Sequence, residues 1–203
     1  EGASPNAKVG QDPAIVIAAH RGHLKILRLL REAGANIEAM NGSGATAIMW
    51  AAYTGRTECV RDLINAGCDL NVADQTDGST ALIFASRWGH RDSVRLLIEA
   101  DADTDPTDSS GKSALQLATA FGHTAIIDLL RLQRRQDLHA LEARLAERLA
   151  PGDAGLVLRG HLLEARLERR ADRVLAPGRR RPRLAALLLL LRRHGGGAQR
   201  GAG

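Results

Sequence analysis

Among the histidines that stand directly after a glycine in this sequence, three share one position of a repeat, and histidine is the side chain best suited to acid–base chemistry and metal binding near neutral pH. They are His23, His90 and His123. A zinc site needs three or four groups that converge, but no Asp or Glu recurs beside these histidines at ligand spacing. Their shared position predicts a structural role, and we expect no metal site.

The segment Ser110–Ser113 reads S-G-K-S and is similar to the end of a phosphate-binding loop. That loop requires a first glycine five residues before the second one, and position 106 is proline here. It also requires a buried strand before it, whereas this segment aligns with a turn that recurs along the chain. No Ser/His/Asp or Cys/His arrangement stands out either. We therefore expect no cofactor, no catalytic residue and no enzymatic activity.

The two cysteines, Cys59 and Cys68, are too few for a disulfide framework and lack the C-x-x-C spacing of a zinc site. Cys59 falls on the apolar face of an expected helix, which favours a small core residue. This usage predicts a reducing compartment, the cytoplasm or alternatively the nucleus. The longest wholly apolar run, residues 184–191, is too short for the roughly 30 Å hydrocarbon core of a membrane.

The elements that carry these residues repeat along the chain. Four glycines are separated by 33, 34 and 33 residues: Gly22, Gly55, Gly89 and Gly122. Before each lies a short segment with small residues, and after each lies a segment with apolar residues at helical spacing. This pattern predicts two short helices in each unit, and the first helix ends at a glycine in the left-handed conformation. One such pair cannot bury its apolar face, so four stacked units are expected to form one core.

In this register the chain resembles the ankyrin repeat family, whose unit runs approximately G-x-T-P-L-H-x-A-A-x-x-G-H, then a second helix, then G-A-D-x-N. Four copies match over residues 8–133. The T-P-L-H tetrad appears as T-A-I-M at Thr46–Met49 and T-A-L-I at Thr80–Ile83, without the family's Pro and His. Asp101 must hold a position that is usually glycine. The resemblance implies an all-α solenoid of helix-turn-helix repeats.

The net charge of +5 is the sum of two unlike regions. The chain through Leu130 has 11 basic and 16 acidic residues, and the remainder has 17 basic and 7 acidic ones. All five aromatic residues lie in the first region. We expect an array over 1–133, a basic amphipathic helical extension over 134–175 in which the last helix continues from Thr124, and a disordered low-complexity tail over 176–203.

The resemblance implies a concave recognition surface built from the turn tips and the first helices. Aromatic residues and arginine dominate the hot spots of protein interfaces. Candidate contact residues are Arg21, Tyr53, Arg87, Trp88 and Phe121 on the helices, with Asp77, Ser79 and Lys112 at the turn tips. The alternative is that the rings pack between units, which we expect for Trp50 and Phe84.

These observations predict a non-enzymatic scaffold that presents a preformed surface to a protein of unknown identity. One alternative makes the arginine runs at 179–183 and 192–193 a tether to nucleic acid or anionic lipid. The tail has no aromatic residue to stack on bases, which favours a solvated tail. Another alternative makes the chain the regulatory fragment of a larger enzyme. Finally, Leu63–Asn71 resembles the pattern modified by asparaginyl hydroxylases, so Asn71 is a candidate modification site.

Overall fold

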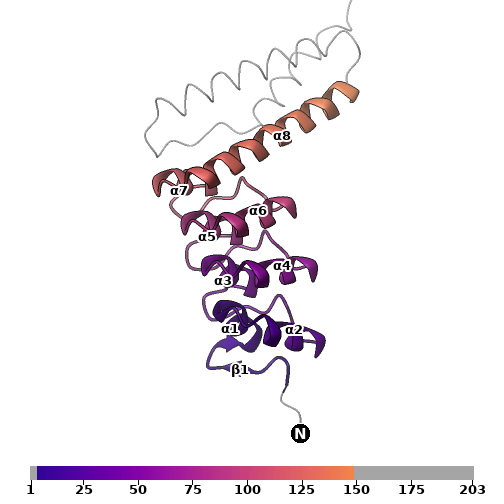
Figure 1. Ribbon diagram of the computed structural model, residues 1–203, viewed down its shortest axis with the longest axis vertical. Helices are drawn as coiled ribbons and strands as arrows, with labels where there is room; N and C mark the ends of the chain where they lie inside the picture. Colours follow the sequence, from indigo (N-terminus) through magenta and orange to yellow (C-terminus); the bar gives the residue numbers. More distant parts are fainter. Residues whose placement is uncertain (1–3, 149–203) are drawn as a thin grey trace, which may run out of the picture. The chain divides into compact units, whose positions relative to one another are not determined.

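Four helix pairs, called units 1 to 4, follow one another along the chain in the computed structural model, which describes residues 4–148. The helices are α1 (Ala14–Arg21), α2 (Leu24–Glu32), α3 (Ala47–Tyr53), α4 (Thr57–Asn65), α5 (Ala81–Arg87), α6 (Arg91–Glu99), α7 (Ala114–Ala120) and α8 (Thr124–Arg148). Figure 1 shows the pairs stacked in chain order, with α1 and α2 nearest the N-terminus. The described residues thus form the all-α repeat array that the sequence predicts.

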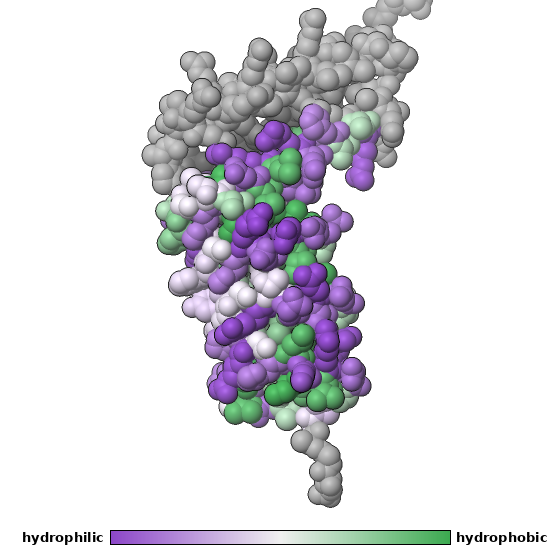
Figure 2. Space-filling view, in the orientation of Figure 1, coloured by the Kyte–Doolittle hydropathy of each residue, from purple (hydrophilic) through white to green (hydrophobic). Residues whose placement is uncertain are grey.

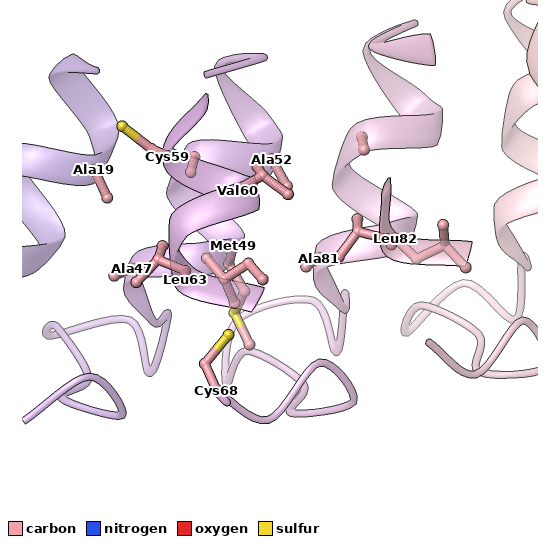
Figure 3. Close-up of a cluster of buried hydrophobic side chains, with 14 of the residues drawn as sticks. Ala19, Ala47, Met49, Ala52, Cys59, Val60, Leu63, Cys68, Ala81 and Leu82 are labelled. Atoms are coloured by element: carbon pink, nitrogen blue, oxygen red, sulfur yellow. The ribbon is translucent and has the colours of Figure 1, made fainter. Parts of the chain in front are cut away.

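Small residues let the first helices of successive units pack side by side. The residue four positions before each repeat glycine is a buried alanine: Ala18, Ala51, Ala85 and Ala118. The second helices also contact one another, α2 with α4, α4 with α6 and α6 with α8. Figure 3 shows side chains of neighbouring units, among them Ala19, Met49 and Leu82, gathered in one cluster. One continuous core therefore runs through the array.

The glycine after each first helix has a left-handed backbone, and in units 2 and 3 it also lies against a histidine of the next unit. Gly55 and Gly89 have φ of 68° and 78°, a region that a side chain with a Cβ enters only with strain. In addition, a Cβ on Gly89 would lie 2.7 Å from Cε1 of His123. His123 Nε2 lies 3.1 Å from the Arg87 carbonyl oxygen, and His90 Nε2 lies 3.0 Å from that of Tyr53. The structural role predicted for these two histidines is confirmed.

Two side-chain carboxylates and an amide organise the turns before the first helices of units 2, 3 and 4. Asn41, Asp74 and Asp108 occupy the same position in units 2, 3 and 4, and each accepts backbone N–H groups of its own turn. Backbone hydrogen bonds then join neighbouring turns, because the carbonyl oxygen of Asp77 accepts from the N–H of Ser109. The turns are thereby held to one another as well as to their own helices.

Two local features refine the sequence-based expectations. A short antiparallel ladder of β1 (Lys8–Val9) and β2 (Asp12–Pro13) precedes α1, where the all-α prediction contained no strand. This ladder closes the first turn through backbone hydrogen bonds. Asp101 has φ of 59° at the end of unit 3, as its replacement of glycine predicts.

The last helix continues past the array. α8 runs for 25 residues to Arg148, as expected from Thr124 onward, and it passes through the anticipated boundary at residue 133 without a break. None of the helices within residues 4–148 is long and apolar enough to cross a membrane. The amphipathic segment at 161–175, the tail at 176–203 and the arginine runs lie outside the described residues.

Both cysteines are buried free thiols in the core. Burial raises the pKa of Cys59, and it raises the pKa of Cys68 to about 12. Figure 3 shows the sulfur of Cys68 beside Met49. A buried thiol with a raised pKa is protonated at neutral pH and a poor nucleophile, so the core role predicted for Cys59 is confirmed.

Candidate functional site

A chain of contacting rings runs along the first helices of the first three units. The ring centroids of His20 and Trp50 lie 4.6 Å apart, and those of Trp50 and Tyr53 lie 5.4 Å apart. Tyr53 then meets Phe84 at 5.9 Å and Trp88 at 5.2 Å, both edge to face. Each edge-to-face pair contributes about 0.5–1.5 kcal/mol beyond its buried area. These contacts hold the ring of Trp88 against Tyr53.

Two of the candidate aromatic residues are well exposed. The side chains of Trp88 and Phe121 follow the ends of α5 and α7, at the same repeat position in units 3 and 4. Trp88 is 52% exposed and Phe121 is 58% exposed. Tyr53 is half-buried beside Trp88, and Arg21 is exposed at the corresponding position of unit 1. Together Arg21, Tyr53, Trp88 and Phe121 form what we call the ring-and-arginine row.

The remaining aromatic residues lie deeper. Trp50 and Phe84 are half-buried and pack against the buried core, as the sequence predicts for rings between units. The indole N–H of Trp50 is buried and has no hydrogen-bond partner in the described part of the chain. Both rings contact Tyr53 of the ring-and-arginine row, and both are less exposed than Trp88 and Phe121.

Arg87 is engaged within the array. Its Nη1 donates to Asp77 Oδ2 at 2.8 Å, and its Nη2 donates to Asp108 Oδ2 at 2.9 Å. Nη2 also lies 3.4 Å from the hydroxyl of Ser79. The guanidinium thus joins the turn of unit 3 to the turn of unit 4. The structure brings three candidate contact residues together, but as an internal network.

This network shifts the pKa values of the aspartates around it. Burial works against ionisation of Asp77, yet hydrogen bonds from Arg87, Ser79 and Asp74 outweigh it and lower the pKa of Asp77 to about 2. Burial opposes ionisation of Asp108 too, but hydrogen bonds from Ser110 and Lys112 and the charge of Arg87 lower its pKa. Asp74 behaves oppositely, because burial and a side-chain hydrogen bond with Asp77 raise its pKa.

The turn-tip candidates divide according to exposure. Ser79 is fully buried, so its proposed place on a contact surface is corrected: its N–H donates to Asp74 and Asp77, which fixes the turn. Lys112 is half-buried, and its N–H donates to Asp108 Oδ1 at 2.9 Å. Asp77 is partly exposed, with its carboxylate held by Arg87. Turn residues with short polar side chains commonly bond to their own backbone, which the sequence-based selection did not weigh.

Sequence reasoning missed the residues that hold these turns. Asn41, Asp74 and Asp108 recur at spacings of 33 and 34, and this recurrence of a side-chain acceptor was the available signal. It also missed Asp62, a buried carboxylate on α4 that accepts from Arg28 Nε at 2.7 Å and lies 3.5 Å from Arg31 Nε. That pair crosses from unit 1 to unit 2, which a pattern within one helix does not indicate.

The segment that resembles the end of a phosphate-binding loop forms a turn and the N-terminal cap of α7. Gly111 lies in a turn with φ of 75°, and Ser113 caps α7 in a capping box with Gln116. The hydroxyl of Ser113 is therefore used by the helix N-terminus, as the alignment with a recurring turn predicts. Within residues 4–148 no three His, Cys, Asp or Glu side chains are grouped so as to hold a metal ion.

Comparisons with known proteins identify the repeated helix pair. Residues 1–74 and 63–140 match the family model of ankyrin repeats in three copies. Over 60 residues the chain is 43% identical to ankyrin repeat domain-containing protein 29 of Danio rerio, covering 29% of this chain and 20% of that protein. The human protein of that name is 41% identical over 56 residues, covering 27% and 19%. The chain thus aligns with about a fifth of the length of these relatives, and by the family match it belongs to the ankyrin repeat family.

Proposed function

We propose that the array is a protein-binding module whose contact surface is the ring-and-arginine row, with Trp88 and Phe121 as its central anchors. Ankyrin repeats generally mediate protein–protein interactions. Asp77, Arg87 and Lys112 border this surface, and Ser79 supports it from inside the turn. The module acts by binding rather than by catalysis, and its partner is a protein of unknown identity.

One observation carries the proposal: two large rings are more than half exposed at the same position of adjacent units. A single exposed ring needs no explanation, but rings repeated along a preformed surface are the usual anchors of protein interfaces. The edge-to-face contact with Tyr53 holds Trp88 in place. Binding therefore costs little additional ordering of these side chains, which favours affinity.

The proposal extends to the organisation of the chain. We assign residues 1–133 to the binding array, 134–175 to a helical extension and 176–203 to a low-complexity tail. The two buried free thiols support a reducing compartment such as the cytoplasm or the nucleus. A tether to nucleic acid or anionic lipid through the arginine runs is the alternative function, and the experiment below separates the two.

The test is quantitative affinity capture with the full chain and with the double variant Trp88→Ala/Phe121→Ala. Loss of two anchors is expected to weaken binding of a true partner by about 30-fold or more, the effect of removing roughly 2 kcal/mol at a hot spot. Met40→Ala removes an exposed apolar side chain elsewhere and serves as the control. Circular dichroism establishes that each variant is folded.

We expect to find proteins that bind the unmodified chain and Met40→Ala but not the double variant. Equal retention by all three chains would contradict the proposal. Capture that is insensitive to the double variant and falls steeply with salt would favour the arginine tether instead.

A further inference from the structure

Units 1 and 4 carry the same side chains on the face that looks toward the preceding unit. An offset of 100 residues relates His23 to His123, Ile26 to Ile126, Leu29 to Leu129 and Leu30 to Leu130. Identical residues at three positions of the second helix and at the residue before it allow a direct comparison. The surroundings of the two helices differ, because a unit precedes unit 4 in the described chain and none precedes unit 1.

In unit 4 this face is covered by unit 3. Ile126 is 1% exposed, Leu129 is half-buried against the core, and α8 contacts α6. The ring of His123 lies over Gly89 and its Nε2 meets the Arg87 carbonyl oxygen at 3.1 Å. Cys59 and Ser93, the residues that correspond to Ile126 in units 2 and 3, are also buried.

In unit 1 the same face is open. Ile26 is 49% exposed and Leu29 is 65% exposed. His23 is exposed, and its ring has no hydrogen-bond partner within residues 4–148. Figure 2 shows hydrophobic side chains at this end of the array. Isolated exposed leucines are common, but here the residue types of a covered face are repeated without the cover.

We propose that this face, defined by His23, Ile26 and Leu29, is the docking surface for a further ankyrin-type unit, stacked on unit 1 as unit 3 is stacked on unit 4. The stacking contact already occurs three times in the array, and the open face continues it. The docking unit places an apolar second helix against Ile26 and Leu29. Its first helix ends at a glycine beneath the ring of His23, with a carbonyl oxygen facing Nε2.

The repeat itself favours a stacked unit over a second copy of this chain as the occupant. The matching face of unit 4 is covered by the helix pair of unit 3, stacked in the same direction along the array. A symmetric dimer would instead pair α2 with another α2 around a two-fold axis, a contact that does not occur within residues 4–148. The charges of Arg28 and Arg31 lie away from this face, because both side chains meet Asp62 on α4 of the following unit.

The experiment extends the chain with a duplicate of its own unit 3. Residues 68–101, placed directly before Gly2, preserve the 100-residue register in which unit 3 precedes unit 4. Covering the face is expected to raise the thermal midpoint by about 5 °C or more. Ile26→Asp/Leu29→Asp is expected to abolish that gain, while changing the midpoint of the unextended chain by less than about 2 °C because both side chains are exposed there.

Leu132→Asp, at an exposed leucine of α8, is the matched control and is expected to leave the gain intact. Hydrogen exchange of the α2 amides reports whether the face is covered, independently of the midpoint. The proposal is overturned if neither the 68–101 extension nor a second one made from residues 35–67 protects α2. It is also overturned if the unextended chain forms a dimer that Ile26→Asp/Leu29→Asp dissociates, which would assign the face to a second copy.

Discussion

Arg87 at the end of α5 donates to Asp108 in the next turn at 2.9 Å, and this contact crosses from unit 3 to unit 4. Asp108 is almost fully buried, so its negative charge depends on the guanidinium and on the N–H groups of its own turn. An arginine selected from the sequence as a candidate contact residue thus fastens two repeats together.

Replacing Arg87 by alanine is expected to destabilise the array. The variant leaves Asp77 and Asp108 without their common cation, and loss of charged hydrogen bonds at a largely buried site costs about 2–3 kcal/mol. Arg87→Lys should recover part of this, because lysine keeps the charge but not the two-pronged geometry. Urea unfolding of the full chain measures both, with the exposed Arg91→Ala as a control expected to change little. An Arg87→Ala variant that keeps wild-type stability but loses partner binding would show that Arg87 is chiefly a contact residue.

Asp77 is expected to make stability fall in acid. Its pKa in the folded chain is about 2, below the ordinary value of 3.8, so the folded state prefers the ionised form. The resulting stabilisation is fully present above pH 3.8 and is lost as the pH falls toward 2. Urea unfolding between pH 6 and pH 2 should show a smaller loss for Asp77→Asn than for the wild type.

Asp74→Asn is the companion variant in the same turn. The raised pKa of Asp74 means that the folded state resists its ionisation, so a neutral amide should be tolerated at neutral pH. Asn41 already performs this role in unit 2. An equal reduction of the acid dependence by both variants would contradict the opposite directions of the two pKa shifts.

Two repeat glycines allow conformational strain to be separated from contact between units. Gly89 and Gly122 both have positive φ, but only Gly89 lies beneath a histidine ring, since nothing approaches the Cβ position of Gly122. Gly122→Ala should cost about 1–2 kcal/mol from the left-handed backbone alone. Gly89→Ala should cost roughly 1 kcal/mol more, because it also displaces His123 from the Arg87 carbonyl. Equal losses in thermal unfolding would show that the histidine contact contributes nothing.

Asn71 remains a proposed hydroxylation site. Its side chain must leave a hydrogen bond within the array before an enzyme can reach it. Its Oδ1 accepts from the N–H of Asp103 at 2.8 Å, so the side chain joins the loop of unit 2 to that of unit 3. We expect mass spectrometry of the native protein to find one added oxygen on the Asn71 peptide. The modified fraction should rise in Arg87→Ala, whose weakened array frees this loop more often. A peptide that stays unmodified in both chains would exclude the site.

The sequence by itself determined the number of units and the pairing of helices in the part of the chain that the structure describes. Glycine spacing and small residues at repeated positions are local features that a single chain displays. It also determined that Asp101 adopts a positive φ and that His90 and His123 are structural, because position within a repeat dictates both.

Only the tertiary structure decided which polar residues face inward and which apolar residues remain open. Asp62 finds Arg28 across a unit boundary, and Ser79 is buried in a turn that reads as a surface loop. Ile26 and Ile126 are the same residue at the same repeat position, yet the first is half exposed and the second is covered. Burial depends on what stacks against a side chain, and that neighbour lies about one repeat away along the chain.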